Sequence, residues 1–133
     1  MTTLTPEQLD MIKRLQPFFK ERMGEWREGD EYCFWNKFQN KYLYRRVPPN
    51  IRQHNMSDAE FSTQVLRIPK PIDWQNLERG LWGMMDWKAY TFDIKHDGTV
   101  FLNKRSLTLQ IDCISIGDIF TALLKALCHQ EGV

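Results

Sequence analysis

The sequence contains no apolar run that approaches the roughly 20 residues needed to span a bilayer. Its first residues lack the basic start and apolar stretch of a secretory signal. The cysteines Cys33, Cys113 and Cys128 are odd in number and far apart, so a disulfide framework is not expected. These absences favour a cytoplasmic protein that keeps its thiols reduced and has no membrane contact.

Catalytic and metal-binding signatures are also absent, so neither an enzymatic activity nor a cofactor is expected. A formal net charge of +1 gives no overall attraction to nucleic acid, and any such attraction has to be local. The chain has no ribonucleoprotein-type motif, glycine-rich clamp or helix-turn-helix pattern. With 133 residues, 42% of them hydrophobic and 26% charged, the composition predicts a soluble globular protein.

The hydrophobic periodicity predicts one α+β domain that spans residues 1–133. We expect an antiparallel sheet, made of a hairpin and a three-stranded meander, with about four helices packed on one or both of its faces. Pro17 should kink or split the first helix. The predicted helices begin at Thr5, Ser57, Asp73 and Ser115, and the predicted strands cover 31–35, 41–46, 90–95, 100–102 and 107–112.

The two strands of the hairpin would flank a loop at 36–40. In that pairing Tyr32 and Phe34 share one face with Tyr42 and Tyr44, because side chains alternate along a strand. The opposite face then carries Cys33, Trp35 and Leu43. Both faces are bulky, which indicates a strand pair enclosed between two layers.

The segment 34–54 concentrates positive charge, because it contains five basic residues and no Asp or Glu. Five aromatic residues are interleaved with these cations, a combination that suits single-stranded nucleic acid. An ordinary hairpin with a solvated basic edge would have the same composition, and aromatic residues enclosed between layers would leave only a charged rim. The candidate nucleic-acid contacts are Lys37, Lys41, Arg45, Arg46 and Arg52.

The segment 72–87 holds three tryptophans that do not share one helical stripe. At least one of Trp74, Trp82 and Trp87 should therefore be exposed or lie at an interface. We expect a protein partner or a second copy of the chain to bind there. Gly80 and Gly83 weaken the helix expected there and indicate close helix packing.

Two groups of titratable residues are considered as sites of acid–base chemistry. Asp93, His96, Asp97 and Asp112 would suit a metal or an acid–base pair if they converged, although residues 96–98 are also an ordinary hairpin turn. Cys128 and His129, with Glu131, are neighbours on a predicted helix, where adjacent side chains diverge. Neither group predicts an active site.

The stretches RIPKPIDWQNLERGLWGMMDW (67–87) and SIGDIFTALLKALCHQEGV (115–133), with the meander between them, resemble small uncharacterised proteins encoded by phages and prophages. The resemblance covers about the last half of the chain and implies an α-β-α sandwich. It implies no activity and no functional residues.

The function expected from the sequence is therefore that of a non-catalytic interaction module of phage or mobile-element origin. It would act through an aromatic-rich surface or by self-association. The alternative is single-stranded nucleic-acid binding through residues 34–54. A small acid–base or metal-dependent enzyme is a third interpretation.

Overall fold

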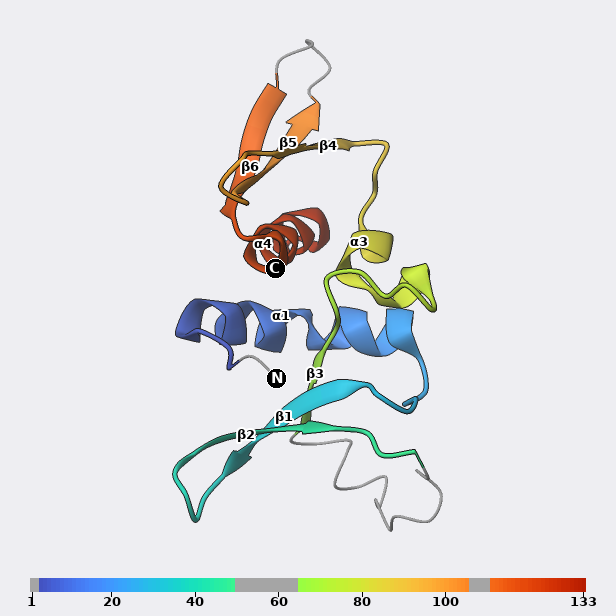
Figure 1. The fold of residues 1–133 in the computed structure, drawn as a ribbon, viewed down its shortest axis with the longest axis vertical. Coiled ribbons are helices and arrows are strands. Elements are labelled where there is room, and N and C mark those ends of the chain that lie inside the picture. Colours follow the sequence, from blue (N-terminus) through green and yellow to red (C-terminus); the bar gives the residue numbers. More distant parts are fainter. Residues whose placement is uncertain (1–2, 50–64, 106–110) are drawn as a thin grey trace. The chain divides into compact units, whose positions relative to one another are not determined.

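The computed structural model of the chain describes residues 3–49, 65–105 and 111–133. These residues form two compact units, Met1–Pro69 and Lys70–Val133, and each contains a three-stranded antiparallel sheet (Figure 1). The α+β class is therefore confirmed. The hairpin and the meander belong to separate sheets rather than to one, because the hairpin takes its third strand from residues 65–68. The expectation of a single domain stays a prediction.

The first unit begins with α1 (Pro6–Met23). Thr5 caps this helix through a capping box: its hydroxyl accepts a hydrogen bond from the Gln8 amide, while the Gln8 side chain accepts one from the Thr5 amide. The helix continues through Pro17, so the expected split does not occur. It ends at Gly24, whose φ of 66° suits glycine.

The sheet of this unit has the strand order β2-β1-β3. The turn between β1 and β2 contains four residues, because Asn36 pairs directly with Lys41. The Asn36 side chain accepts hydrogen bonds from the amides of Phe38 (2.9 Å) and Gln39 (3.0 Å), and Asn40 adopts a φ of 51°. The strands are β1 (Glu31–Asn36), β2 (Lys41–Arg46) and β3 (Val65–Ile68).

This register corrects the expected faces of the hairpin. Trp35 lies opposite Tyr42, and Cys33 lies opposite Tyr44, so these four side chains share one face. Tyr32 and Phe34 point to the other face. The sequence-based pairing assumed a five-residue loop, and a shift of one residue moves every side chain of one strand to the opposite face.

The outer edge of β3 is closed by a side chain of α1. The Gln16 amide group accepts a hydrogen bond from the Arg67 backbone N–H at 2.9 Å and donates one to the Arg67 carbonyl at 2.9 Å. The same amide group donates to the Ile12 carbonyl at 3.0 Å. Gln16 therefore does for β3 what another strand would do, and satisfies backbone groups at a sheet edge.

The second unit begins with irregular backbone where one long helix was expected from Asp73. Asp73 does not cap a helix: its carboxylate accepts hydrogen bonds from the amides of Gln75 and Asn76 in a local turn, and the cap position of the first helical turn falls to Asn76. The chain then forms only η1 (Leu77–Arg79) and α3 (Leu81–Met84). A Cβ on Gly80 would lie 2.6 Å from the backbone nitrogen of Asp73, and a Cβ on Gly83 would overlap the Leu77 carbonyl. Both glycines therefore lie against backbone of their own segment, rather than at the helix–helix contact that was expected.

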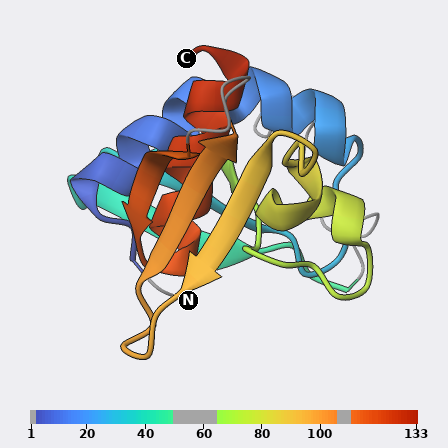
Figure 2. The same ribbon diagram turned by 90° about the horizontal axis from the view of Figure 1, so that it is seen from above.

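The expected meander is confirmed as a sheet with the order β4-β5-β6. Helix α4 (Ile119–Glu131) packs against β5 and β6 on one face of this sheet (Figure 2). Its cap is Asp118, which accepts a hydrogen bond from the Thr121 amide at 2.8 Å; the expected start at Ser115 is wrong, because that residue belongs to β6. The strands are β4 (Tyr90–Ile94), β5 (Val100–Arg105) and β6 (Ile111–Gly117).

In the described parts of the chain the α-helices are α1, α3 and α4, three rather than the expected four. The helix expected to begin at Ser57 falls mostly within residues 50–64, outside the described residues. The same holds for the first part of the strand expected at 107–112.

Replacing Gln16 by Ala should lower the free energy of unfolding by about 1–3 kcal/mol, because it leaves two backbone groups of β3 without their partner. Urea denaturation measures the change. Gln39→Ala is the matched control, since Gln39 is exposed in the hairpin turn and should change stability little. Equal losses in the two variants would show that Gln16 does not close the edge.

Candidate functional site

A groove of about 600 Å³ lies between the start of α1 and the β1–β2 hairpin, within the first unit. Four consecutive residues of β2 line it, and so does Trp35 of β1. The opposite wall comes from the chain that leads into α1 and from the first turns of this helix. The lining residues are Thr3, Leu4, Pro6, Leu9, Trp35, Lys41, Tyr42, Leu43 and Tyr44.

The aromatic wall of the groove is held by contacts within the unit. Trp35 and Tyr42 pack edge to face, with ring centroids 5.1 Å apart. Lys13 of α1 places its Nζ 5.4 Å from the centre of the Tyr42 ring. A hydrogen bond with Tyr42 raises the pKa of Lys13 above its ordinary value, which indicates a favourable contact between this cation and the tyrosine.

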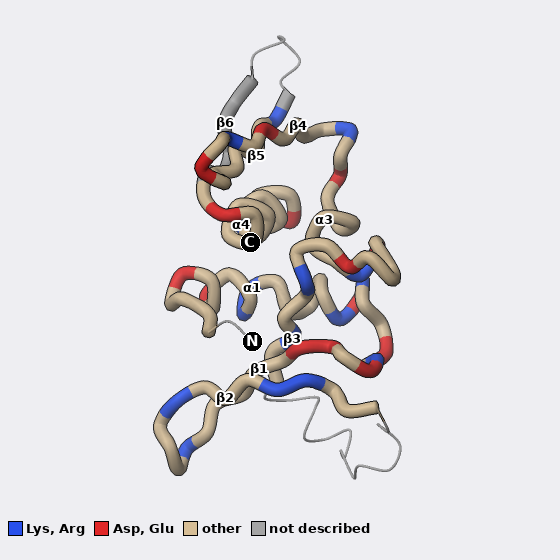
Figure 3. The backbone as a smooth tube through the Cα atoms, in the orientation of Figure 1, with Lys and Arg blue, Asp and Glu red and all other residues tan. Residues whose placement is uncertain are grey.

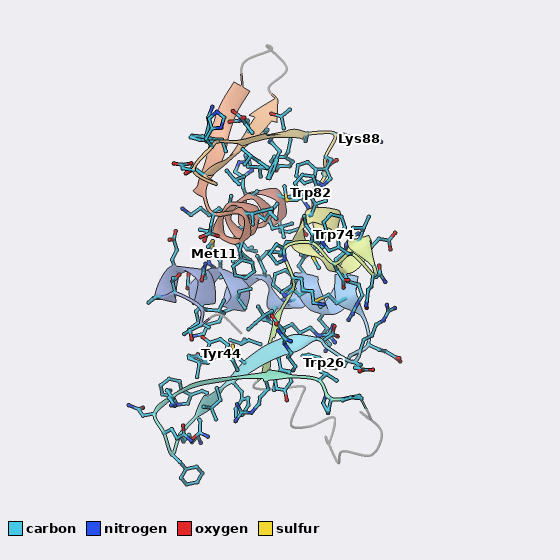
Figure 4. The ribbon with its side chains drawn as sticks, viewed as in Figure 1. Met11, Trp26, Tyr44, Trp74, Trp82 and Lys88 are labelled. Atoms are coloured by element: carbon cyan, nitrogen blue, oxygen red, sulfur yellow. The ribbon has the colours of Figure 1, made fainter. Side chains whose placement is uncertain are left out.

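Tyr44 fixes the approach of the chain to α1. Its hydroxyl oxygen accepts a hydrogen bond from the Leu4 backbone N–H at 3.1 Å. Figure 4 labels Tyr44 beside the hairpin. The two walls of the groove are thus joined at one end by a hydrogen bond between residues 40 positions apart.

The hairpin presents its cations and two aromatic rings to solvent. Phe38 is 100% exposed at the turn, and Trp35 is 44% exposed. Lys37, Lys41 and Arg45 are exposed as well, and basic residues mark the turn and β2 in Figure 3. No acidic residue occurs between positions 32 and 49.

The five predicted nucleic-acid contacts therefore differ in how available their charge is to a ligand. Arg46 forms a salt bridge with Glu31 at 3.0 Å, which offsets its charge. Arg45 donates a hydrogen bond to the Tyr44 carbonyl at 3.0 Å and keeps its exposure. Lys37 and Lys41 flank the exposed Phe38. Arg52 lies outside the described residues.

The other face of the hairpin carries a separate aromatic row. Tyr32 and Phe34 stack with centroids 6.4 Å apart, and Trp26 packs edge-on against Tyr32 at 5.7 Å. The guanidinium carbon of Arg67, a buried residue, lies 4.2 Å from the centre of the Trp26 ring. Burial raises the pKa of Tyr32, and the positive charge of Arg45 partly opposes this shift. All these rings are half-buried and serve packing.

Cys33 lies on the groove face but does not suit nucleophilic chemistry. Its side chain is fully buried, and burial raises the pKa of its thiol to about 11, against a smaller opposing effect of Lys13. The thiolate is the reactive form, so little of it exists at neutral pH. We therefore treat the groove as a binding site.

The three tryptophans of the predicted partner interface differ in their surroundings. Trp82 and Trp87 pack on each other with centroids 4.0 Å apart, and both contact Phe92 edge to face. The Trp87 indole also donates a hydrogen bond to the Trp82 carbonyl. Trp74 is 82% exposed, and Leu77 beside it is 53% exposed. The structure thus joins two of these residues in a half-buried cluster and leaves Trp74 at the surface.

The residues considered for acid–base chemistry do not converge. Asp93 pairs with Lys95 at 3.0 Å and lies opposite Phe101 on β5. Asp112 lies opposite Lys104, three residues further along β5 and on its other side, so the two aspartates are not neighbours. Nothing is described of the Asp112 side chain.

The turn at 96–98 is accounted for by backbone geometry. Asp97 accepts a hydrogen bond from the Thr99 amide at 2.9 Å, and hydrogen bonds from Thr99 lower the pKa of this carboxyl. Gly98 has a φ of 87°, and His96 is exposed. Within the described ranges no group of His, Cys, Asp and Glu is arranged to hold a metal ion.

The pair Cys128–His129 diverges as expected for helical neighbours. Cys128 is buried, while His129 is exposed and lies 3.4 Å from the Tyr90 hydroxyl through its Nδ1. Glu131 is exposed at the helix end. Gln130, between His129 and Glu131, bonds to the backbone of Met84 and Asp86 and ties α4 to α3. The residues at the end of α4 therefore have structural roles, and they do not form an active site.

Comparison of the chain with protein-family models, with curated proteins and with solved structures gives no match. The resemblance to phage proteins thus stays an expectation. Across the described residues, no helix has the length and apolar character needed to cross a membrane.

Sequence reasoning did not identify the groove or the contribution of Lys13 to it. The sequence did contain a signal for the register that forms the groove. Asn36 and Asn40 are residues that favour turns, and they are compatible with a four-residue loop at 37–40. The position of Lys13 depends on the packing of α1 beside the hairpin, which no local pattern indicates.

Proposed function

We propose that the protein is a non-catalytic interaction module that binds single-stranded nucleic acid through the β1–β2 hairpin. The observation that carries the proposal is the exposure of Phe38 and Trp35 among cations. Phe38 is fully exposed between Lys37 and Lys41, and Trp35 is nearly half-exposed beside the groove. Bases stack on exposed aromatic rings without regard to sequence, while nearby cations contact the phosphates.

The charge distribution supports the same ligand. The hairpin carries Lys37, Lys41, Arg45 and Arg46 without an acidic residue after Glu31, although the whole chain has a net charge of only +1. Subtracting the Arg46–Glu31 pair leaves three cations on one hairpin, Lys37, Lys41 and Arg45. A local concentration of this kind attracts a polyanion over about 10 Å at moderate ionic strength.

A protein contact at Trp74 is a second candidate function, favoured by one observation. Trp74 is 82% exposed, and Leu77 is 53% exposed three residues later. Tryptophan is enriched at the energetic centres of protein interfaces. This surface would serve a partner or a second copy independently of the hairpin.

Reversing the charges of Lys37, Lys41 and Arg45 to Glu should reduce binding of single-stranded DNA or RNA by at least tenfold in 50 mM salt. Each lost phosphate contact should lower the slope of log affinity against log salt by about 0.7, which makes about 2 for three contacts. Fluorescence anisotropy over a salt series measures both quantities.

The matched control reverses three exposed cations elsewhere, Lys20, Lys88 and Lys104, and so changes the net charge equally. It should retain most of the affinity and of the slope. If the wild-type chain retains no single strand at low salt, the proposed function is wrong.

Truncating the exposed rings should weaken binding without changing the salt slope. Phe38→Ala removes a side chain with no packing role, and Trp35→Ala removes a second ring. Each should cost about 1–3 kcal/mol of binding free energy if a base stacks there. Trp74→Ala is the control, because it removes an exposed tryptophan from the other unit. Unchanged affinity in Phe38→Ala and Trp35→Ala would contradict a stacking role.

The candidate contact at Trp74 predicts association that depends on this side chain. Sedimentation velocity over a concentration series should detect a dimer of the wild-type chain and a weaker dimer of Trp74→Ala. Phe38→Ala is the control, since it removes an exposed ring from the other unit. A wild-type chain that stays monomeric throughout the series would remove self-association at Trp74.

A further inference from the structure

We infer that the groove between α1 and the hairpin takes one unpaired base of the strand that the hairpin binds. The inference rests on the proposed function and gives it a preference for strands with free bases. Trp35 and Lys41 belong to both the groove and the hairpin surface, whereas Phe38 lies outside the groove and its aliphatic wall lies outside the hairpin, so the two sites are tested separately at Phe38 and at that wall.

The walls of the groove suit a flat heteroaromatic ring. Trp35, Tyr42 and Tyr44 line one side with aromatic surface. The other side is aliphatic, and it is formed by Leu4, Pro6 and Leu9 with Thr3 beside them. The volume of about 600 Å³ falls within the roughly 300–1,000 Å³ of ligand pockets, so a base and part of its sugar can enter.

Two cations lie at the groove and suit the phosphate of a nucleotide bound there. Lys41 lines the groove itself, and Lys13 lies against Tyr42 of its aromatic wall. None of the lining residues is acidic, and so the lining does not repel a phosphate.

The same charges argue against a second copy of this chain in the groove. Strand β2 is at the edge of its sheet, and pairing of two β2 strands would bring Lys41, Arg45 and Arg46 of both copies together. Like charges on paired strands are destabilising, and edge lysines are a common protection against such pairing. An anionic occupant has no such conflict.

A base within a duplex is stacked on its neighbours and cannot enter a groove of this kind without being extruded. The occupant is therefore a nucleotide of a single strand. Its ring would lie between the aliphatic and the aromatic wall, and the adjoining phosphates would follow Lys41 toward Lys37.

The test compares two strands of about ten nucleotides with identical phosphates, one of thymidine and one abasic. The wild-type chain should bind the thymidine strand at least tenfold more tightly than the abasic strand. Because Phe38 also stacks a base in the proposed function, the groove is filled in the Phe38→Ala background: Leu9→Trp, which adds the bulk of an indole there, should lose most of the preference that remains while it keeps the affinity and salt slope for the abasic strand. Leu77→Trp in the same background, at an exposed position of the other unit, is the control and should keep the preference.

Thr3→Trp is a second way to fill the groove, because Thr3 lines it from an exposed position ahead of α1. Because Thr3 precedes α1, this variant does not place a larger side chain within the helix, as Leu9→Trp does. Thermal melting of each variant verifies folding before binding is compared.

Three outcomes would overturn the inference, each for a different reason. If folded Leu9→Trp and Thr3→Trp keep the full preference of the Phe38→Ala background for thymidine, the groove does not hold a base, and the proposed function stands. If the wild-type chain binds both strands equally, bases are not recognised at all. If it binds neither strand, the proposed function fails together with the inference.

Discussion

The pairing of Asn36 with Lys41 decides what the hairpin can do. A four-residue turn places Trp35 opposite Tyr42 and Cys33 opposite Tyr44, so two tyrosines and a tryptophan share the face next to the start of α1. A loop longer by one residue would move the tyrosines to the other face and would remove the aromatic wall of the groove. The Asn36 side chain stabilises the turn because it accepts hydrogen bonds from the amides of Phe38 and Gln39, two and three residues later.

The two edges of this sheet differ in what covers their backbone groups. On β3 the Gln16 side chain bonds to both backbone groups of Arg67 and closes the edge. On β2 the edge borders the groove and carries exposed cations. Cations at an edge discourage pairing with another strand, and they also attract an anion, so one composition serves solubility and the proposed binding alike.

Much of the local structure follows from short-range rules that the sequence displays. The capping box of Thr5 and Gln8, the stop at Gly24, the turn at Asp97–Gly98 and the stripe of α4 each depend on residues within a few positions. The meander was predictable because apolar and polar side chains alternate along it. The long helix expected from Asp73 does not form, and the helical pattern did not show that the backbone at Gly80 and Gly83 closes onto residues 72–78, where a Cβ has no room.

Composition by itself determined that residues 34–54 concentrate cations and aromatic rings, and that catalytic signatures are absent. It could not determine which rings face solvent, because that depends on a register that changes face with one residue of loop length. Nor could it bring Lys13 to Tyr42 or Leu4 to Tyr44, since these contacts join segments about 30 to 40 positions apart. Only the packing of α1 beside the hairpin turns a basic aromatic segment into a groove with two walls.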